Sequence, residues 1–158
     1  MNLPVLNIPR YEMKIKEVDN QIKVFDQLRK RYVSLSPEEY VRQQFTTWLI
    51  SEFNYPPSLM ANEIAVDVNG MKKRCDTIVF NSDGTPLIIL EYKAPTVTIS
   101  QNTFDQIVRY NMSLKAKYLI ISNGINHYCC KIDYRNNNYH FIPTIPDFRE
   151  LNNAFNDN

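Results

Sequence analysis

Apolar and polar residues in the middle of the chain are arranged as three consecutive β-strands would require. Residues 62–68 alternate between polar and apolar side chains, and Asn69-Gly70 follows as a two-residue hairpin signal. Two further apolar runs flank a turn-rich linker at 81–86. The pattern predicts an antiparallel meander of strands over 62–68, 73–81 and 87–93.

Two segments with helical spacing surround this meander. Ser36-Pro37-Glu38-Glu39 is a strong helix start, because serine is a good N-cap and proline suits the first helical position. Apolar residues then recur on one helical face, at Val41, Phe45, Trp48, Leu49 and Phe53. Ser100 is the predicted N-cap of a second helix over about 101–115.

The second helix leads into another apolar run, at 118–122. A strand–helix–strand connection of this length favours a parallel, right-handed crossover onto strand 87–93. Further strands are expected at 127–132 and 139–142. The predicted fold class is therefore α/β, with a mixed central sheet flanked by helices.

The two ends of the chain carry weaker patterns. Residues 11–25 alternate about a turn and predict an N-terminal hairpin, and the basic cluster 29–31 that follows is expected to be solvated. The segment 143–158 is expected to be a loosely attached tail. We expect a single domain over 1–158 with its core at about 36–142.

Composition adds a few limits to this picture. A chain of 158 residues with 44% hydrophobic and 12% aromatic residues is long and apolar enough to fold as a globule. The net charge of +1 gives no overall basic field, so a DNA partner would need a local patch. Three cysteines make a poor disulfide framework, and no apolar run reaches the length of a membrane span. We expect a reduced, cytoplasmic protein.

Candidate chemistry lies on the two apolar strands around the linker. Asp76 sits early on the first strand, and Glu91 and Lys93 close the second on a common face. Antiparallel pairing would bring Asp76 beside Glu91. Two convergent carboxylates suit Mg²⁺, and a neighbouring lysine can assist a water and stabilise charge developing on phosphate. The alternative is a cross-strand salt bridge without function.

Both predicted helices contribute further candidates. Glu38 lies seven residues before Phe45, so it is expected on the inward face of the first turn, while Glu39 has a capping role to fill. Glu38 is then either a favourable charge at the helix N-terminus or an acid that points into a site. On the second helix Gln106 and Tyr110 are four residues apart and share a face.

These motifs together resemble a known nuclease superfamily. The resemblance rests on Arg74-Cys75-Asp76-Thr77, on the run from Leu87 to Pro95, and on Gln106-x-x-x-Tyr110. In this combination the chain resembles the PD-(D/E)xK nucleases. Cys75 stands before Asp76, where the superfamily's motif has a proline. The segments 35–43 and 121–124 further resemble the N-terminal domain of type I restriction enzyme R proteins.

The resemblance implies a restriction-endonuclease-like fold and specific roles. Asp76 and Glu91 would be ligands of Mg²⁺, which Mn²⁺ can replace, with the Tyr92 carbonyl as a third. Lys93 would be the catalytic lysine. Glu38 would match the acid of the first helix, and Gln106 and Tyr110 would lie near the lysine and the DNA backbone.

The leading hypothesis is therefore a metal-dependent DNA endonuclease domain, with DNA as partner and with other restriction-modification subunits or a second copy as candidate partners. The chain contains no Gly-x-x-x-x-Gly-Lys phosphate loop, so we expect activity without a motor. A catalytically silent module that binds DNA or protein with the same fold is the alternative. A structural globule with a simple salt bridge is more remote.

Overall fold

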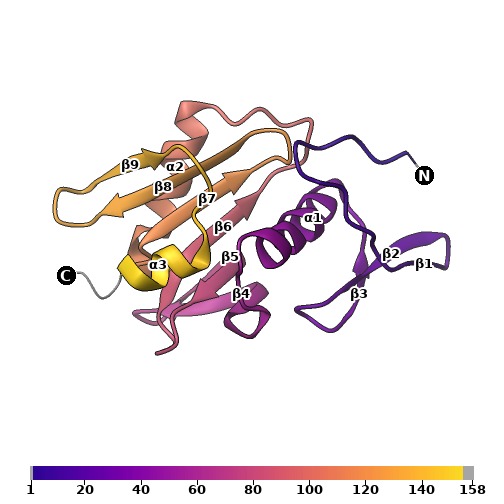
Figure 1. The fold of residues 1–158 in the computed structure, drawn as a ribbon, viewed down its shortest axis with the longest axis horizontal. Helices are drawn as coiled ribbons and strands as arrows, with labels where there is room; N and C mark the ends of the chain where they lie inside the picture. Colours follow the sequence, from indigo (N-terminus) through magenta and orange to yellow (C-terminus); the bar gives the residue numbers. More distant parts are fainter. Residues whose placement is uncertain (1, 155–158) are drawn as a thin grey trace.

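The structure, a computed structural model, describes residues 2–154, with the side chains up to Leu151. Its centre is a six-stranded sheet in the order β4-β5-β6-β7-β8-β9 (Figure 1). The strands of this sheet are β4 Met60–Val68, β5 Met71–Phe80, β6 Pro86–Tyr92, β7 Tyr118–Ser122, β8 His127–Asp133 and β9 Asn138–Ile142.

The pairing of these strands confirms the predicted mixed sheet. Strands β4, β5 and β6 form an antiparallel meander, with Asn69 and Gly70 at positive φ in the first turn. Strand β7 runs parallel to β6, and α2 Gln101–Asn111 forms the crossover between them. A short 3₁₀ turn, η2 Met112–Leu114, ends this helix.

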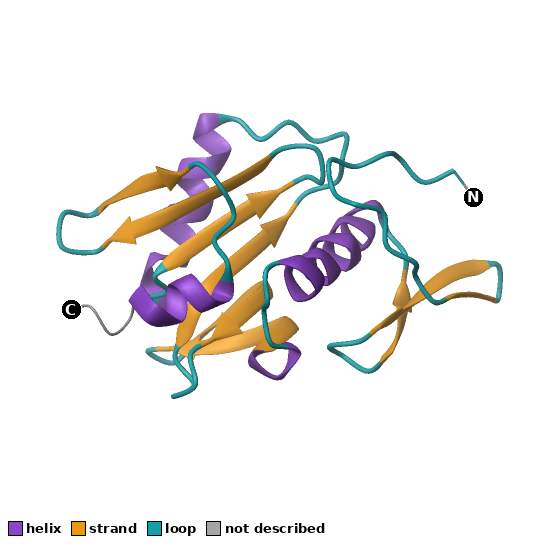
Figure 2. Ribbon diagram, in the orientation of Figure 1, coloured by secondary structure: helices purple, strands orange, loops and turns teal. Residues whose placement is uncertain are grey.

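Two hydrophobic clusters lie on opposite faces of the sheet, and helices cover both faces (Figure 2). Helix α1 Pro37–Glu52 and the C-terminal α3 Phe148–Ala154 cover one face, and α2 covers the other. The 3₁₀ turn η1 Pro57–Leu59 links α1 to the sheet. Strand β6 contributes residues to both clusters and is therefore buried on both faces, which explains its continuous apolar run.

Helix α1 begins as the sequence predicts. The Ser36 hydroxyl accepts a hydrogen bond of 3.0 Å from the Glu39 N–H, and Pro37 occupies the first turn. Val41, Phe45 and Leu49 form its buried face. The Glu39 side chain, however, does not complete a capping box; it points into the protein and contacts arginines.

The N-terminal hairpin is larger than predicted. It is a three-stranded antiparallel sheet of β1 Ile15–Val18, β2 Gln21–Asp26 and β3 Arg31–Ser34. The expectation of a solvated basic cluster is wrong for Arg29, whose guanidinium is paired with Asp26 and Glu39. The turn there is closed by Asp26, whose Oδ1 accepts from the Leu28 N–H at 2.9 Å and whose backbone carbonyl accepts from the Lys30 N–H at 2.7 Å. Arg29 supplies the cation that the buried Asp26 carboxylate needs.

The expectation of a loosely attached tail is also wrong for the described part of 143–158. The Phe148 N–H donates to the Phe53 carbonyl (2.8 Å), and the Tyr55 hydroxyl donates to the Pro146 carbonyl (2.8 Å). Leu151 of α3 is buried in the cluster beneath α1. Apolar residues spaced along this segment explain the packing; residues 155–158 lie outside the described part.

Candidate functional site

The predicted acids meet where β5 and β6 separate. Pairing between the two strands ends at Thr77 and Leu90, although β5 continues to pair with β4 and β6 with β7. Asp76 lies in this fork, and its Oδ2 accepts a hydrogen bond from the Tyr92 N–H at 2.9 Å. The carboxylate thus replaces the missing strand partner of Tyr92 and is fixed within the sheet.

Glu91 lies beside Asp76, as the spacing predicted. Burial, the negative charge of Asp76 and a hydrogen bond between the two carboxyls raise the pKa of Glu91 to about 8, against the opposing effects of Lys93 and Arg42. The two carboxyl groups are therefore close enough for Asp76 to act directly on Glu91. A divalent cation would relieve their repulsion.

Lys93 follows directly after the last residue of β6 and is partly buried. Its charge acts on Glu91, and its backbone N–H donates to the Ser122 carbonyl of β7 at 2.9 Å. This bond continues the parallel ladder past the end of β6, so Lys93 stands at a fixed position next to the acids. The salt-bridge alternative finds no support, because neither acid forms an ion pair with Lys93 within the described residues.

Glu38 does not lie on the inward face. Its side chain is exposed, and the buried acid of the first turn is Glu39. A helix turns by 100° per residue, and the position after Glu38 is the one that faces the sheet. Glu39 accepts from Arg29, Arg42 and Gln43, at 2.6, 2.8 and 2.9 Å.

Arg42 of α1 connects Glu39 to the acids at the fork through its ion pairs. Its Nη2 lies 2.6 Å from Glu63 of β4 and 3.7 Å from Asp76 Oδ1. Sequence reasoning missed both Arg42 and Glu63, because each appeared as one polar residue in an amphipathic element. The spacing of Glu39 and Arg42 by three residues was the available signal.

Gln106 and Tyr110 lie on the exposed side of α2. Lys73 of β5 donates to the Tyr110 carbonyl, and its Nζ is 4.5 Å from the centre of the Tyr110 ring. This contact joins α2 to the strand that carries Asp76. No hydrogen bond of the described residues joins Gln106 to the acids or to Lys93.

The donors at the fork fit a hard cation only in part. Among residues 2–154, no group of three or more His, Cys, Asp or Glu side chains is close enough to hold a metal ion. Asp76 and Glu91 supply two carboxylates, so the remaining ligands would be the Tyr92 carbonyl, water and substrate oxygens. Such an incomplete protein shell is normal for Mg²⁺, which retains several waters.

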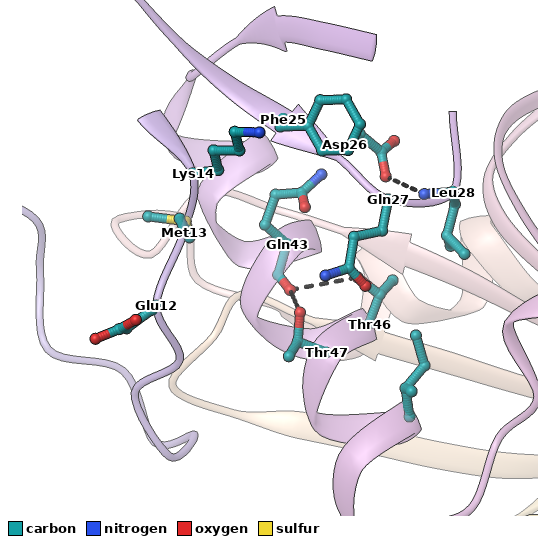
Figure 3. Close-up of a pocket in the computed structure, with 11 residues that line it drawn as sticks. Glu12, Met13, Lys14, Phe25, Asp26, Gln27, Leu28, Gln43, Thr46 and Thr47 are labelled. Atoms are coloured by element: carbon teal, nitrogen blue, oxygen red, sulfur yellow. Dashed lines mark hydrogen bonds between the residues drawn. The ribbon is translucent and has the colours of Figure 1, made fainter. Parts of the chain in front are cut away.

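A separate cavity of about 280 Å³ lies between the N-terminal sheet and α1 (Figure 3). Several polar groups of its lining are already engaged: the hydroxyls of Thr46 and Thr47 donate to backbone carbonyls of α1 at 2.8 Å, and the Gln43 amide donates to Glu39. Asp26 on its wall accepts from the Leu28 N–H at 2.9 Å. With these groups paired, the cavity is a weaker candidate than the fork.

The other reactive side chains are structural. The three cysteines are free and buried, and burial raises the pKa of each thiol to about 12. His127 is held between the Ser122 hydroxyl and the Asn7 carbonyl, at 2.7 and 2.8 Å. None of the helices in residues 2–154 is long and apolar enough to cross a membrane.

Comparison with known proteins agrees with this architecture. A solved fragment described as an HsdR subunit of a type I restriction enzyme from Vibrio vulnificus YJ016 is similar over 77% of this chain, with 22% identity and a TM-score of 0.53. The match spans 25% of that fragment. No curated protein matches the chain. The family described as type I restriction enzyme R protein N terminus matches residues 37–146, so the chain belongs to this family.

Proposed function

We propose that the chain is a metal-dependent DNA endonuclease domain whose reaction centre is the fork between β5 and β6. The observation that carries the proposal is the convergence of Asp76 and Glu91 there, with burial and mutual repulsion raising the pKa of Glu91. Family membership supports it, because the R proteins belong to restriction enzymes.

The proposed roles follow from position. Asp76, Glu91 and the Tyr92 carbonyl would hold Mg²⁺ or Mn²⁺, which would supply charge neutralisation at phosphate and a more acidic water. Lys93, fixed beside Glu91 by its bond to β7, would orient the attacking water and stabilise charge on the phosphate. The exposed Lys72 at the open end of β5 offers positive charge to the DNA backbone.

The first test is cleavage of supercoiled plasmid and single-stranded DNA with Mg²⁺ or Mn²⁺. The Glu91→Ala and Lys93→Ala variants are expected to lose activity by about 100-fold or more, since each removes a group that acts in the transition state. Lys131→Ala, an exposed lysine of β8, is the matched control and should cleave like the parent.

Cleavage that EDTA abolishes, and that both site variants lose, would support the nuclease assignment. Equal background cleavage by the parent and the site variants would favour the silent binding module instead. The salt dependence of a gel shift would then measure how many phosphates that module contacts.

A further inference from the structure

Polar side chains from β2, the turn after it, α1, β4 and β5 form a mostly buried ring that includes Asp76 at the fork. One route runs from Asp26 of β2 through Arg29 and Glu39 to Arg42, and from there to Asp76. The second route starts at the same Asp26: Asn62 of β4 donates to it at 3.0 Å, and Thr77 donates to Asn62 at 2.6 Å. Thr77 is the chain neighbour of Asp76.

Asp26 is the point where the two routes meet, and it is only 1% exposed. Burial alone would raise its pKa, but hydrogen bonds from Arg29 and Asn62 outweigh that effect and hold the pKa below its usual value. A buried carboxylate that remains charged needs fixed donors. The N-terminal sheet, which lies beside α1 (Figure 1), is therefore joined to the fork by directed polar contacts.

Arg42 is the member of the ring that reaches the fork. Its side chain is 7% exposed and spans three acids, with Nη1 on Glu39 and Nη2 on Glu63 and near Asp76. Its Nε is buried and has no hydrogen-bond partner within the part of the chain that the structure describes. An unpaired buried N–H is costly, so the side chain is held in place by its other contacts.

Glu63, which contacts Arg42, has an unusual backbone conformation that is a second, independent observation at the fork. The pairs Asn62–Thr77 and Ile64–Cys75 place Glu63 opposite Asp76 in the β4–β5 register. Its backbone φ is +51°, a left-handed conformation in the middle of a strand. For a residue other than glycine this conformation costs about 1–2 kcal/mol. The carboxylate so oriented contacts both Arg42 and Arg74.

From the ring and the strained Glu63 we infer that Arg42, Glu63 and Arg29 are positioning residues that hold Asp76 in the fork. Arg42 forms an ion pair with Asp76 Oδ1, and the Tyr92 N–H donates a hydrogen bond to Oδ2. Glu63 and Glu39 fix Arg42, and Arg29 fixes Glu39 to the N-terminal sheet. The inference rests on the proposed function for its purpose, but the position of Asp76 can be measured without metal or DNA.

The position of the Asp76 carboxylate can be measured by hydrogen exchange at two neighbouring backbone amides, those of Tyr92 and Lys93. The Tyr92 N–H donates to Asp76, whereas the Lys93 N–H donates to Ser122 on the opposite side of β6. In Arg42→Gln, Glu63→Gln and Arg29→Gln, the Tyr92 amide should exchange about tenfold faster, while Lys93 stays at the parental rate. A ring that only stabilised the fold would accelerate both amides together.

The matched control is Arg74→Gln. Arg74 contacts the same Glu63 at 3.1 Å, but its side chain is 76% exposed and it is not part of the ring. This variant should leave both amides unchanged. Arg42→Lys keeps the charge but cannot span three acids, and we expect it to behave like Arg42→Gln. Glu63 is half-buried, so Glu63→Gln provides a readout even if an Arg42 variant does not fold.

Titration of the same proteins with Mn²⁺ separates this inference from the proposed function. The ring variants should bind Mn²⁺ about 10- to 100-fold more weakly, the usual effect of losing a group that orients a metal ligand. A parent that binds no Mn²⁺, with Tyr92 still selectively accelerated in the variants, would contradict the metal site and leave the ring supported. Equal rates for Tyr92 in all proteins, or joint acceleration of Tyr92 and Lys93, would overturn the inference.

Discussion

Folding disfavours the ionised form of the Glu91 carboxyl group. Burial, the charge of Asp76 and a hydrogen bond with Asp76 raise its pKa to about 8 in the folded protein. The unfolded value is about 4.3. Because the folded state binds this proton more tightly, the stabilisation by Glu91 is complete at low pH and is lost as the pH rises from about 4.3 towards 8.

Glu91→Gln removes this ionisation and keeps the shape of the side chain. We expect the metal-free variant to be more stable than the parent at pH 8, by up to about 4–5 kcal/mol, with a flatter dependence on pH. Urea denaturation in EDTA between pH 5 and 9 measures the difference. Glu17→Gln, a change at an exposed acid of β1, should follow the parental curve. A Glu91→Gln variant that is less stable at every pH would show that the neighbours of Glu91 favour its charged form.

The sequence predicts Glu91 and Asp76 more readily than the charged side chains that surround them. Asp76 and Glu91 are identifiable because a charge that ends an apolar strand is conspicuous. Glu38 was preferred to Glu39 because a capping box would occupy Glu39, whereas Ser36 needs only the backbone N–H of Glu39. The long-range partners of Arg42 depend on tertiary packing, which local spacing does not encode.

At the scale of elements, the turn between β7 and β8 holds the N-terminal segment against α1. The Asn7 N–H donates to the Gly124 carbonyl at 2.8 Å, and Gly124 has a φ of +86°. A Cβ at this glycine would lie 2.8 Å from Leu6 Cδ2 and 3.2 Å from Val41 Cγ2. The glycine is therefore required both by its backbone conformation and by the close approach of the N-terminal segment.

Gly124→Ala is expected to lower the free energy of unfolding by about 2–4 kcal/mol, because left-handed backbone strain adds to overpacking against Leu6. Gly84→Ala is the matched control, since Gly84 has nearly the same φ, +87°, but open space around its Cβ position. It should lose only the backbone part, about 1–2 kcal/mol. Thermal or chemical denaturation compares the two, and equal losses would show that Leu6 moves aside without cost.

The elements with the strongest patterns are predicted from the sequence, and the short strand β3 is not. Strand β7 falls at the predicted 118–122 because four of its five residues are apolar or aromatic and it lies buried in the centre of the sheet. Strand β3, four residues with a charged first position, carries too little alternation to be recognised. It forms by antiparallel pairing with β2, after a turn in which Arg29 is paired with Asp26 and Glu39.

At the scale of the whole molecule, the site lies between parts that are distant in sequence. The N-terminal sheet reaches the fork through Arg29 and α1, and the C-terminal segment packs behind α1 through Phe148 and Leu151. The rings of Tyr55 and Phe148 lie 5.5 Å apart, at the end of α1 that is remote from Glu39. Helix α1 is thus held at both ends by contacts that close the fold.

The contact between the C-terminal segment and the core can be tested by shortening one buried side chain. Leu151 is buried beneath α1, so Leu151→Ala should lower the free energy of unfolding by about 2–4 kcal/mol through lost transfer energy and a cavity. The measurement is urea denaturation followed by tryptophan fluorescence, since Trp48 lies in the same cluster. Met71→Ala, at an exposed position of the β4–β5 turn, is the control and should change stability by less than about 0.5 kcal/mol. A loss as small for Leu151 as for Met71 would restore the loosely attached tail, and α1 would then depend on the N-terminal sheet for its position over the fork.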